Sequence, residues 1–422
     1  MSAIATDELD RLLTAMVQSA QGISDLLFVA GKPPQVEVDG ALESPAFEWP
    51  EAVLTSQRIR SLAEAILDNN PKFMSDLAEH GSCDCCYALG ELCRFRVNIY
   101  RQNGGLAMVL RRLPSEIPTL ESLGLPPLFR EIVQEKNGLV FVTGGSGNGK
   151  STTLAAMLHE INRTSKVHVV SLEDPIEFLH PQLKSTFSQR ELGRDFFTFP
   201  DGLRAALRQA PKVILVGEIR DRDTMEIALT AGETGHLVLT TLHTISVDQT
   251  IHRIVGLFSR NEEQQVRERL VGSLRFIVGQ RLVPRKRGGR LLVTEMMGSS
   301  LRSREAIVLG ENDNRRLHDI IEAGAAAGWH SFEQSLIRAF EDDLITEETA
   351  LRYSVNRPIM HQRLDLSRTR LPRSATDAPP PPMVVVAAAP MAEAARPAPT
   401  PPPLLKTEPH PGLLKGLLNG IV

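Results

Sequence analysis

The sequence predicts an α/β nucleotide-binding domain that follows a mixed α+β domain and precedes a helical extension. Beyond Gly138, short runs rich in Val, Leu and Ile alternate with longer helical patterns, as expected for parallel strands covered by helices on both faces. A glycine-rich segment follows the first of these runs. Ahead of Pro114, helical and strand patterns are mixed, and 422 residues are enough for two folded domains and a tail.

The N-terminal part begins with apolar residues at helical spacing over residues 8–19 and continues into a strand at residues 25–30. Alternating segments at residues 94–99 and 106–110 indicate further strands, and the turn between them lies at residues 103–105. These patterns together predict a mixed α+β domain.

The second domain is expected to place its strands at residues 139–143, 167–172, 213–216 and 237–241. Polar residues follow each strand, and in such sheets ligands bind at the carboxyl ends of the strands. After Thr294 the pattern becomes mainly helical, and from about Arg370 a Pro/Ala-rich composition predicts disorder. The expected organisation is an N-terminal domain at residues 1–113, a linker at 114–127, a nucleotide-binding domain at 128–298, a helical extension at 299–369 and a disordered tail at 370–422.

Composition and charge disfavour two classes of protein. A formal net charge of -4 and a pI near 6.3 give no overall field that would attract nucleic acid, so no nucleic-acid partner is expected. No apolar run approaches the roughly 20 residues that a membrane-spanning helix needs. The first residues lack the basic start and apolar stretch of a secretory signal, so we expect a cytoplasmic protein.

The four cysteines, Cys83, Cys85, Cys86 and Cys93, lie close together, which raises the question of a metal site. Their spacing is poor for one because adjacent residues of a strand point to opposite faces. Small buried thiols are the favoured interpretation, and a zinc site is the alternative.

Residues 144–151 fit the pattern G-x-x-x-x-G-K-[ST] of a phosphate-binding loop (P-loop), between a predicted strand and a predicted helix. The glycines let successive backbone N–H groups point at phosphate oxygens, and the helix adds the positive end of its dipole. Lys150 is expected to reach the β- and γ-phosphates, and Ser151 to bind Mg²⁺. The residues expected to bind ATP are Gly144, Gly145, Ser146, Gly147, Asn148, Gly149, Lys150, Ser151 and Thr152.

Acidic residues follow two of the predicted strands. The strand that ends at Leu172 leads to Glu173 and Glu177, and a carboxylate there can orient the attacking water. Glu177 is the favoured catalytic residue, Glu173 is its substitute, and a solvated loop is the alternative. Glu218 follows the next strand, as in a Walker B element, so we expect it to act on Mg²⁺ through water and to lie near the nucleophile. A structural salt bridge is the alternative.

Histidines stand at both ends of the strand predicted at residues 237–241. His243 lies at the carboxyl end, where it is expected to sense the γ-phosphate and stabilise its developing charge. His236, at the opposite end, is expected to support strand geometry or a subunit contact. A purely structural histidine is the alternative.

Four segments together resemble the motifs of a known family. Residues 144–157, 172–178, 213–221 and 234–244 are similar to the Walker A, Asp box, Walker B and His box of secretion ATPases. The resemblance is strongest to the type IV pilus retraction ATPases of the type II/IV secretion ATPase family. It covers residues 9–357 in motif order, including the segments at 24–26, 94–98 and 189–191.

The resemblance implies that a PAS-like N-terminal domain and a RecA-like domain clamp ATP between them in a homohexamer. It implies a motor at the cytoplasmic face of the inner membrane that disassembles a pilus through a platform protein. The membrane is then reached only through partners, and a second retraction ATPase is a further candidate partner. Arg96 and Arg111 match arginines that the family directs toward the phosphates, with a surface salt bridge as the alternative for each.

The sequence departs from the family pattern in places. Leu27 stands where the family commonly has His, and Gln209, Ala210 and Lys212 replace a more acidic approach to the Walker B strand. Residues 300–310 differ from the A-I-R-N-L-I-R-E motif of the retraction enzymes. The four-cysteine insert of the extension ATPases is missing after the sheet, which favours the retraction branch.

The expected function is a hexameric, Mg²⁺-dependent ATPase motor that couples ATP hydrolysis to type IV pilus retraction. An accessory retraction motor is the first alternative. A non-hydrolysing ring adaptor held together by ATP is the second, and a nucleic-acid translocase is the third.

Overall fold

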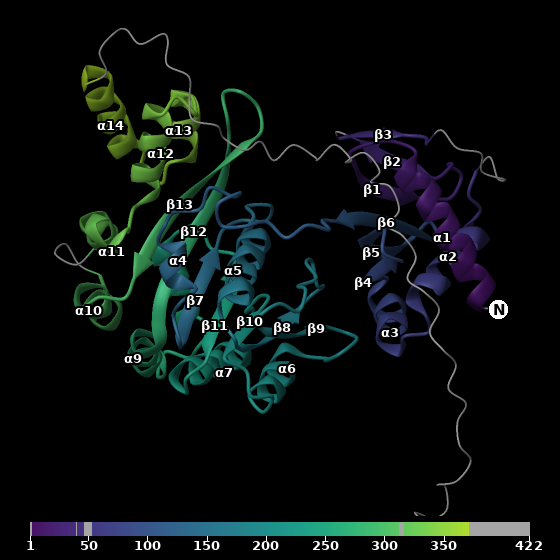
Figure 1. Cartoon of the computed structure of the whole chain (residues 1–422), viewed down its shortest axis with the longest axis horizontal. Helices are drawn as coiled ribbons and strands as arrows, with labels where there is room; N and C mark the ends of the chain where they lie inside the picture. Colours follow the sequence, from purple (N-terminus) through teal and green to yellow (C-terminus); the bar gives the residue numbers. More distant parts are fainter. Residues whose placement is uncertain (1, 39, 46–52, 312–315, 371–422) are drawn as a thin grey trace, which may run out of the picture. The chain divides into compact units, whose positions relative to one another are not determined.

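The computed structural model describes residues 2–38, 40–45, 53–311 and 316–370, which form two sheets with their covering helices (Figure 1). The tail expected at residues 370–422 lies outside the described residues except for Arg370, which ends the last helix. Among the described helices, none has the length and apolar character needed to cross a bilayer.

The N-terminal sheet has six antiparallel strands in the order β3-β2-β1-β6-β5-β4. Helices α1, α2 and α3 pack against one another or against its strands. Asn103 and Gly104 both have positive φ, which suits the tight turn between β5 and β6. The mixed α+β prediction is confirmed, with elements α1 (Ser2–Gln18), β1 (Ile23–Phe28), β2 (Gln35–Val38), β3 (Ala41–Glu43), α2 (Ser56–Leu67), α3 (Pro71–His80), β4 (Ser82–Leu89), β5 (Cys93–Gln102) and β6 (Gly105–Leu113).

The side chains of all four cysteines lie on β4 and β5 and are buried, as the favoured interpretation expects. Burial raises the pKa of Cys83 to about 11 and that of Cys86 to about 12. Within the described residues, no group of three or more His, Cys, Asp or Glu side chains is arranged to hold a metal ion. Cys83, Cys85 and Cys93 contribute to the packing of the N-terminal core, whereas the Sγ of Cys86 accepts a hydrogen bond from Arg94 at 3.8 Å.

The second sheet has seven strands in the order β13-β12-β7-β11-β10-β8-β9. Neighbouring strands are parallel except for the antiparallel pair β12 and β13. The predicted strands agree with β7, β8, β10 and β11 to within one residue at each end. The strands are β7 (Gly138–Thr143), β8 (His168–Glu173), β9 (Thr186–Glu191), β10 (Val213–Val216), β11 (Leu237–Leu242), β12 (Leu274–Pro284) and β13 (Arg290–Gly298).

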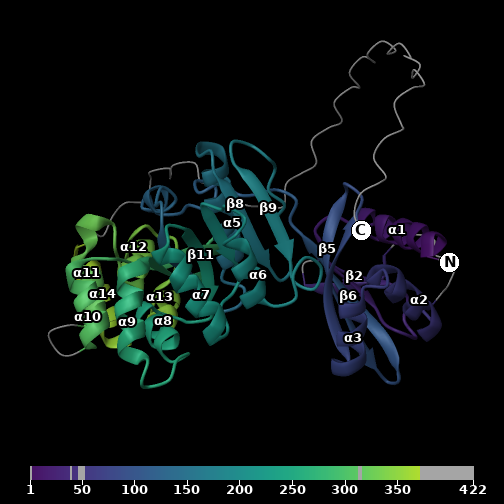
Figure 2. The same cartoon turned by 90° about the horizontal axis from the view of Figure 1, so that it is seen from below.

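Helices cover both faces of this sheet, as the buried strands β7, β10 and β11 require. Helix α5 packs against β7 and β11 (Figure 1), and α6, α7 and α9 pack side by side across the sheet in Figure 2. Part of the expected linker belongs to this core, because Leu120 is buried within it. The helices are α4 (Phe129–Ile132), α5 (Lys150–Thr164), α6 (Phe199–Ala206), α7 (Arg222–Glu233), α8 (Val247–Val255) and α9 (Glu263–Ser273).

The C-terminal extension is helical, as predicted, and starts directly after β13. Three of its helices, α12 to α14, share a small core with Val283 and Val293 of the β12–β13 hairpin. The sequence pattern did not predict this hairpin, whose strand β12 pairs with β7 and so joins the extension to the sheet. The helical elements are α10 (Leu301–Leu309), α11 (Leu317–Ala323), the 3-10 helix η1 (Ala325–Ala327), α12 (Phe332–Glu341), α13 (Glu347–Tyr353) and α14 (Arg357–Arg370).

Candidate active site

The predicted phosphate loop connects β7 to α5 and is held closely against β12. Gly144, Gly147 and Gly149 have φ values of 150°, 75° and 80°, which side chains rarely tolerate. A Cβ at Gly144 would lie 2.6 Å from the carbonyl oxygen of Gln280, so only glycine fits there. Asn148 Oδ1 accepts a hydrogen bond from the backbone N–H of Leu282 at 3.2 Å. These contacts fix the loop backbone in one conformation.

Helix α5 begins at Lys150, and its N-cap, Gly149, offers no side-chain hydrogen bond. The first N–H groups of a helix have no acceptor within the helix, so this end presents donors and a positive dipole to an anion. The Nζ of Lys150 donates to the carbonyl oxygens of Gly144 at 3.0 Å and Gly145 at 3.1 Å. Burial lowers the pKa of Lys150, and the carboxylates of Glu218 and Glu177 oppose this effect.

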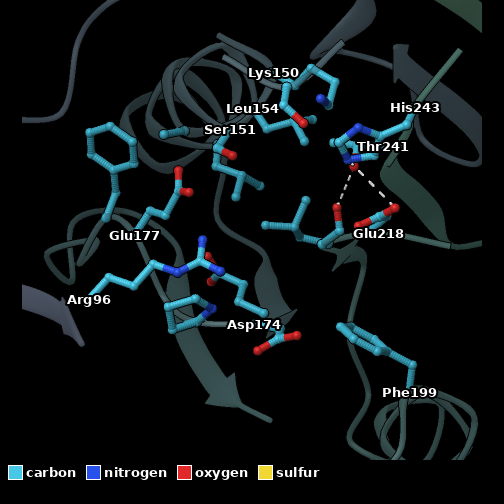
Figure 3. A pocket seen from close by; sticks show the side chains of 18 of the residues that line it. Arg96, Lys150, Ser151, Leu154, Asp174, Glu177, Phe199, Glu218, Thr241 and His243 are labelled. Carbon is cyan, nitrogen blue, oxygen red and sulfur yellow. Dashed lines mark hydrogen bonds and ion pairs between the residues drawn. The ribbon is translucent and has the colours of Figure 1, made fainter. Parts of the chain in front are cut away.

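A cavity of about 360 Å³ lies beside this loop (Figure 3). Figure 3 shows Lys150 and Ser151 at the start of α5, with Glu218 and His243 to one side and Glu177 and Arg96 to the other. The structure therefore brings together side chains from widely separated segments. The sequence-predicted residues that line the cavity are Arg96, Ser146, Gly147, Lys150, Ser151, Glu173, Glu177, Glu218 and His243.

Glu218 and His243 follow the neighbouring parallel strands β10 and β11, so both emerge at the same edge of the sheet. His243 Nε2 lies 3.6 Å from Glu218 Oε1. Thr241 Oγ1 donates to the carbonyl oxygen of Gly217 at 2.7 Å, which ties the two strand ends together. The alternative of a structural salt bridge is also realised, because Arg220 Nε donates to Glu218 Oε2 at 2.9 Å.

Arg220 is a cavity-lining residue to which sequence analysis gave no role. Its position could have been predicted from the sequence, because Arg220 follows Glu218 by two residues and side chains two apart on an extended chain point to the same side. Burial raises the pKa of Asp174, another unassigned residue of the cavity, and Arg220 and Arg96 oppose this rise. Two arginines thus act on the acidic loop that follows β8.

Glu173 and Glu177 differ in their surroundings. Glu173 Oε1 accepts hydrogen bonds from Ser171 Oγ at 2.6 Å and Gln189 Nε2 at 3.2 Å. Protein surrounds its carboxyl although part of the side chain reaches the cavity, and burial raises the pKa of Glu173 to about 7. Glu177 also lines the cavity, from the loop beyond β8. Because the carboxyl of Glu173 is already engaged, the geometry favours Glu177 as the group that contacts water.

The backbone before Glu177 is held from both sides. The N–H of Ile176 donates to Glu191 Oε2 at 3.2 Å. The carbonyl oxygen of Ile176 accepts a hydrogen bond from Arg94 at 2.7 Å, so an arginine of β5 contacts the loop that carries Glu177. Sequence analysis included both Arg94 and Glu191 in matched segments but assigned no role to either.

Arg96 and Arg111 are direct neighbours on β5 and β6. Arg96 lines the cavity, and its Nε lies 3.9 Å from Asp84 Oδ1. Arg111 instead donates from Nε to Asp25 Oδ1 at 2.9 Å, and its side chain is 70% exposed. The structure therefore brings only Arg96 to the other site residues. Arg111 instead forms a salt bridge, which was the alternative role predicted for it.

The remaining segments that sequence analysis singled out lie away from the cavity. His236 Nδ1 is 3.1 Å from the carbonyl oxygen of Ala231, which suits a role in the turn before β11. Residues 300–310 contain α10, whose N-cap Ser300 forms a capping box with Ser303. Leu301 is 87% exposed there.

Comparisons with known proteins show which family the chain resembles. A family model described as type II/IV secretion system protein matches residues 80–325. The chain is 39% identical over 330 residues to the type IV pilus retraction ATPase PilT of Pseudomonas aeruginosa, covering 78% of this chain and 94% of that protein. It is 36% identical over 348 residues to the type IV pilus ATPase PilU of the same species, covering 82% and 88%.

A solved structure is similar over most of the chain. The crystal structure of the pilus retraction motor PilT with bound ADP has a TM-score of 0.75 and 37% sequence identity, covering 84% of this chain and 98% of that one. The family model matches more than half of the chain, and the relatives are matched over most of their length. The chain therefore belongs to the type II/IV secretion system protein family.

Proposed function

We propose that this protein is an ATP hydrolase whose activity drives the retraction of a type IV pilus. The observation that carries the enzymatic part is the cavity in which Lys150, Glu177, Glu218 and His243 meet beside a helix N-terminus. Similarity to PilT over most of both chains supports the cellular part. Composition gives no reason to expect nucleic acid as the cargo.

The donor groups at the cavity suit a nucleoside triphosphate with its magnesium ion. The glycine loop, the free N–H groups at the start of α5 and Lys150 would hold the phosphates. Ser151 and, through water, Glu218 would hold Mg²⁺, which prefers oxygen ligands. The bound metal would neutralise charge on the phosphate oxygens.

The side chains around the cavity have distinct proposed roles in hydrolysis. Glu177 orients the attacking water and accepts its proton, since its carboxylate lines the cavity and its backbone is fixed at Ile176. His243 responds to the γ-phosphate from beside Glu218. Arg96 acts on phosphate charge from β5, whereas Arg111 would first have to leave Asp25.

We further propose the finer organisation that the family resemblance implies. The six-stranded domain is PAS-like, the seven-stranded domain is RecA-like, and six copies form a ring. This ring works at the cytoplasmic face of the inner membrane, which it reaches through a pilus platform protein. A second retraction ATPase is a further partner for the ring.

A gene deletion in the source bacterium tests the cellular role. Loss of the protein should leave surface pili that accumulate and no longer retract, and wild-type protein but not Glu177→Gln should restore retraction. A strain without surface pili would contradict the proposal and indicate an assembly motor. Retraction that persists with reduced force would support the accessory motor.

The alternative of a ring adaptor differs from a motor because an adaptor binds ATP without hydrolysing it. Purified hexamers that bind ATP but release no phosphate would support the adaptor and exclude the motor. DNA or RNA that stimulates phosphate release would support a translocase.

A further inference from the structure

Strand β12 contacts two parts of the active site through neighbouring side chains. Gln280 Nε2 donates to Thr153 Oγ1 of α5 at 2.8 Å, next to the phosphate loop. Consecutive side chains of a strand point to opposite faces, so Arg281 extends the other way. Strand β12 therefore connects the region of the phosphate loop with the segments that bond to Arg281.

Arg281 contacts the loop that follows His243. One guanidinium nitrogen, Nη2, donates to the carbonyl oxygen of Ile245 at 2.9 Å, two residues after His243. The other, Nη1, donates to the carbonyl oxygen of Tyr353 at the end of α13. The guanidinium also lies 4.0 Å from the ring centroid of Phe332. A single cation thus bridges the His243 loop and the C-terminal helices.

A buried carboxylate also holds the segment that follows His243, at Val247. Glu295 of β13 is only 4% exposed, and its Oε2 accepts a hydrogen bond from the N–H of Val247 at 2.7 Å. Val247 begins α8, whose N-cap Ser246 supplies no side-chain cap. Glu295 therefore takes the place of the missing cap and binds the positive end of the helix.

A second buried carboxylate holds the chain on the helical side. Glu333 of α12 is fully buried, and its Oε1 accepts hydrogen bonds from the N–H groups of Val355 at 2.7 Å and Asn356 at 2.8 Å. These residues directly follow α13, where Arg281 bonds to Tyr353. Burial lowers the pKa of Arg281, and the charges of Glu295 and Glu333 oppose this effect. Both carboxylates thus favour the charged form of Arg281, whereas burial and, after it, the charge of Glu333 raise the pKa of Glu295.

Guanidinium geometry gives this bridge its rigidity. The planar fork of arginine fixes the directions of its N–H donors, so the carbonyl oxygens of Ile245 and Tyr353 are held in one relative position. The bond to Tyr353 is partly buried and the bond to Ile245 is exposed, so it is this fixed geometry, together with the contact with the Phe332 ring, that resists a shift of one segment relative to the other.

We propose that Arg281 is a positioning residue for hydrolysis, which holds the loop that carries His243 and couples it to the end of α13. The inference rests on the proposed ATPase function and extends it. Arg281 does not line the cavity, so it acts through His243 and not on ATP. A movement of the His243 loop should therefore be accompanied by a movement at residues 353–356, because Arg281 bonds to both segments.

Substitution of Arg281 by methionine in the full-length protein tests the proposal, because methionine keeps much of the apolar contact with Phe332 but removes the donors. For Arg281→Met, kcat should fall about tenfold while KM for ATP changes less than about twofold, since the phosphate loop is held separately through Gln280 and Asn148. Arg290→Met, an exposed position of the same hairpin, is the matched control and should retain wild-type kinetics.

A double-mutant cycle with His243→Ala distinguishes positioning from a general structural role. In the His243→Ala background, Arg281→Met should lower kcat by less than about twofold, because the side chain that it positions is already gone. Wild-type kcat in Arg281→Met, or the same tenfold loss in both backgrounds, would overturn the proposal.

Hydrogen exchange tests the coupling and provides a second variant if Arg281→Met does not fold. Arg281→Lys keeps the charge, but its ammonium lacks the fork that spans two carbonyl groups. In wild type, a non-hydrolysable ATP analogue should change amide exchange at residues 353–356, and Arg281→Lys should abolish that change. An unresponsive wild type, or an unaltered response in the variant, refutes the coupling. Inactive wild-type protein would instead refute the proposed ATPase function itself.

Discussion

His243 Nε2 lies 3.6 Å from Glu218 Oε1, across the carboxyl ends of two parallel strands. The other carboxylate oxygen of Glu218 accepts a hydrogen bond from Arg220 at 2.9 Å. The residue proposed to support the metal and the residue proposed to sense the γ-phosphate are therefore in direct contact. A shift of the His243 side chain can therefore be transmitted directly to Glu218 without movement of the sheet.

Substitution of Lys150 by alanine should abolish tight nucleotide binding. The ammonium group is the side-chain cation proposed to bind the phosphates from the loop, where it now donates to Gly144 and Gly145. Loss of the charge-assisted hydrogen bonds that it would form with phosphate oxygens should weaken ATP binding by at least about tenfold. Isothermal titration calorimetry with ATP measures this. Lys166→Ala, at an exposed position after α5, should bind like wild type. Equal affinities for wild type and Lys150→Ala would show that the loop does not hold the phosphates.

Substitution of Glu177 by glutamine should separate binding from chemistry. Glutamine keeps the size of the side chain but cannot accept the proton, so kcat should fall about a hundredfold. ATP affinity should change by less than about threefold, because the phosphate contacts remain. Single-turnover hydrolysis measures the first quantity and equilibrium binding the second. Glu131→Gln, on the exposed side of α4, is the control, and a Glu177→Gln enzyme as fast as this control would exclude Glu177 as the base.

Glu173 should make stability depend on pH between 4.5 and about 7. Its pKa is raised in the folded protein, so in this window the folded state binds more protons than the unfolded state. The free energy of unfolding should therefore fall as pH rises through the window, by up to about 3 kcal/mol from this one group. Below pH 4.5 the carboxyl is protonated in both states and the contribution is complete.

The variant Glu173→Gln isolates that contribution, because its amide oxygen can still accept from Ser171 and Gln189 but no longer titrates. Urea unfolding at pH 5 and pH 8 should show a smaller loss of stability in Glu173→Gln than in wild type. Glu131→Gln should behave like wild type. The same loss in Glu173→Gln as in wild type would mean that Glu173 is ionised across the whole range.

Arg96 and Arg111 should differ in what their loss affects. Arg111→Met leaves the carboxylate of Asp25 buried without its partner, so the N-terminal domain should lose roughly 1 kcal/mol of stability. Arg96→Met should lower kcat about tenfold with little change in stability, because Arg96 faces the cavity. Thermal unfolding and steady-state hydrolysis measure the two effects. A tenfold loss of kcat in Asp25→Asn/Arg111→Met, compared with Asp25→Asn alone, would instead assign Arg111 to the phosphates.

The strands of the nucleotide-binding sheet could be predicted because each is a short apolar run with polar residues at its carboxyl end. The β12–β13 hairpin could not, since Arg281, Thr294 and Glu295 interrupt its apolar pattern. Thr294 and Glu295 are tolerated in the interior because His330 and the N–H of Val247 supply their hydrogen-bond partners. The half-buried Arg281 bonds to the carbonyl oxygen of Ile245. Such partners are distant in sequence, so no local pattern contains them.

The candidate site, like the fold, could be predicted only in part from the sequence. Parallel strands have their carboxyl ends at one edge of the sheet, so the sequence pattern alone predicts that Glu218 and His243 lie together. The choice between Glu173 and Glu177 depended on Gln189 of β9, and the separation of Arg96 from Arg111 depended on Asp25. Spacing along the chain does not report which carboxylate a given side chain reaches.

The most direct test of the account is phosphate release by the purified full-length protein with ATP, with and without Mg²⁺. The account predicts steady release that requires Mg²⁺ and is lost in both Lys150→Ala and Glu177→Gln, while Lys166→Ala and Glu131→Gln remain active. Release by Glu177→Gln at the wild-type rate, or ATP binding by wild type without any release of phosphate, would contradict it.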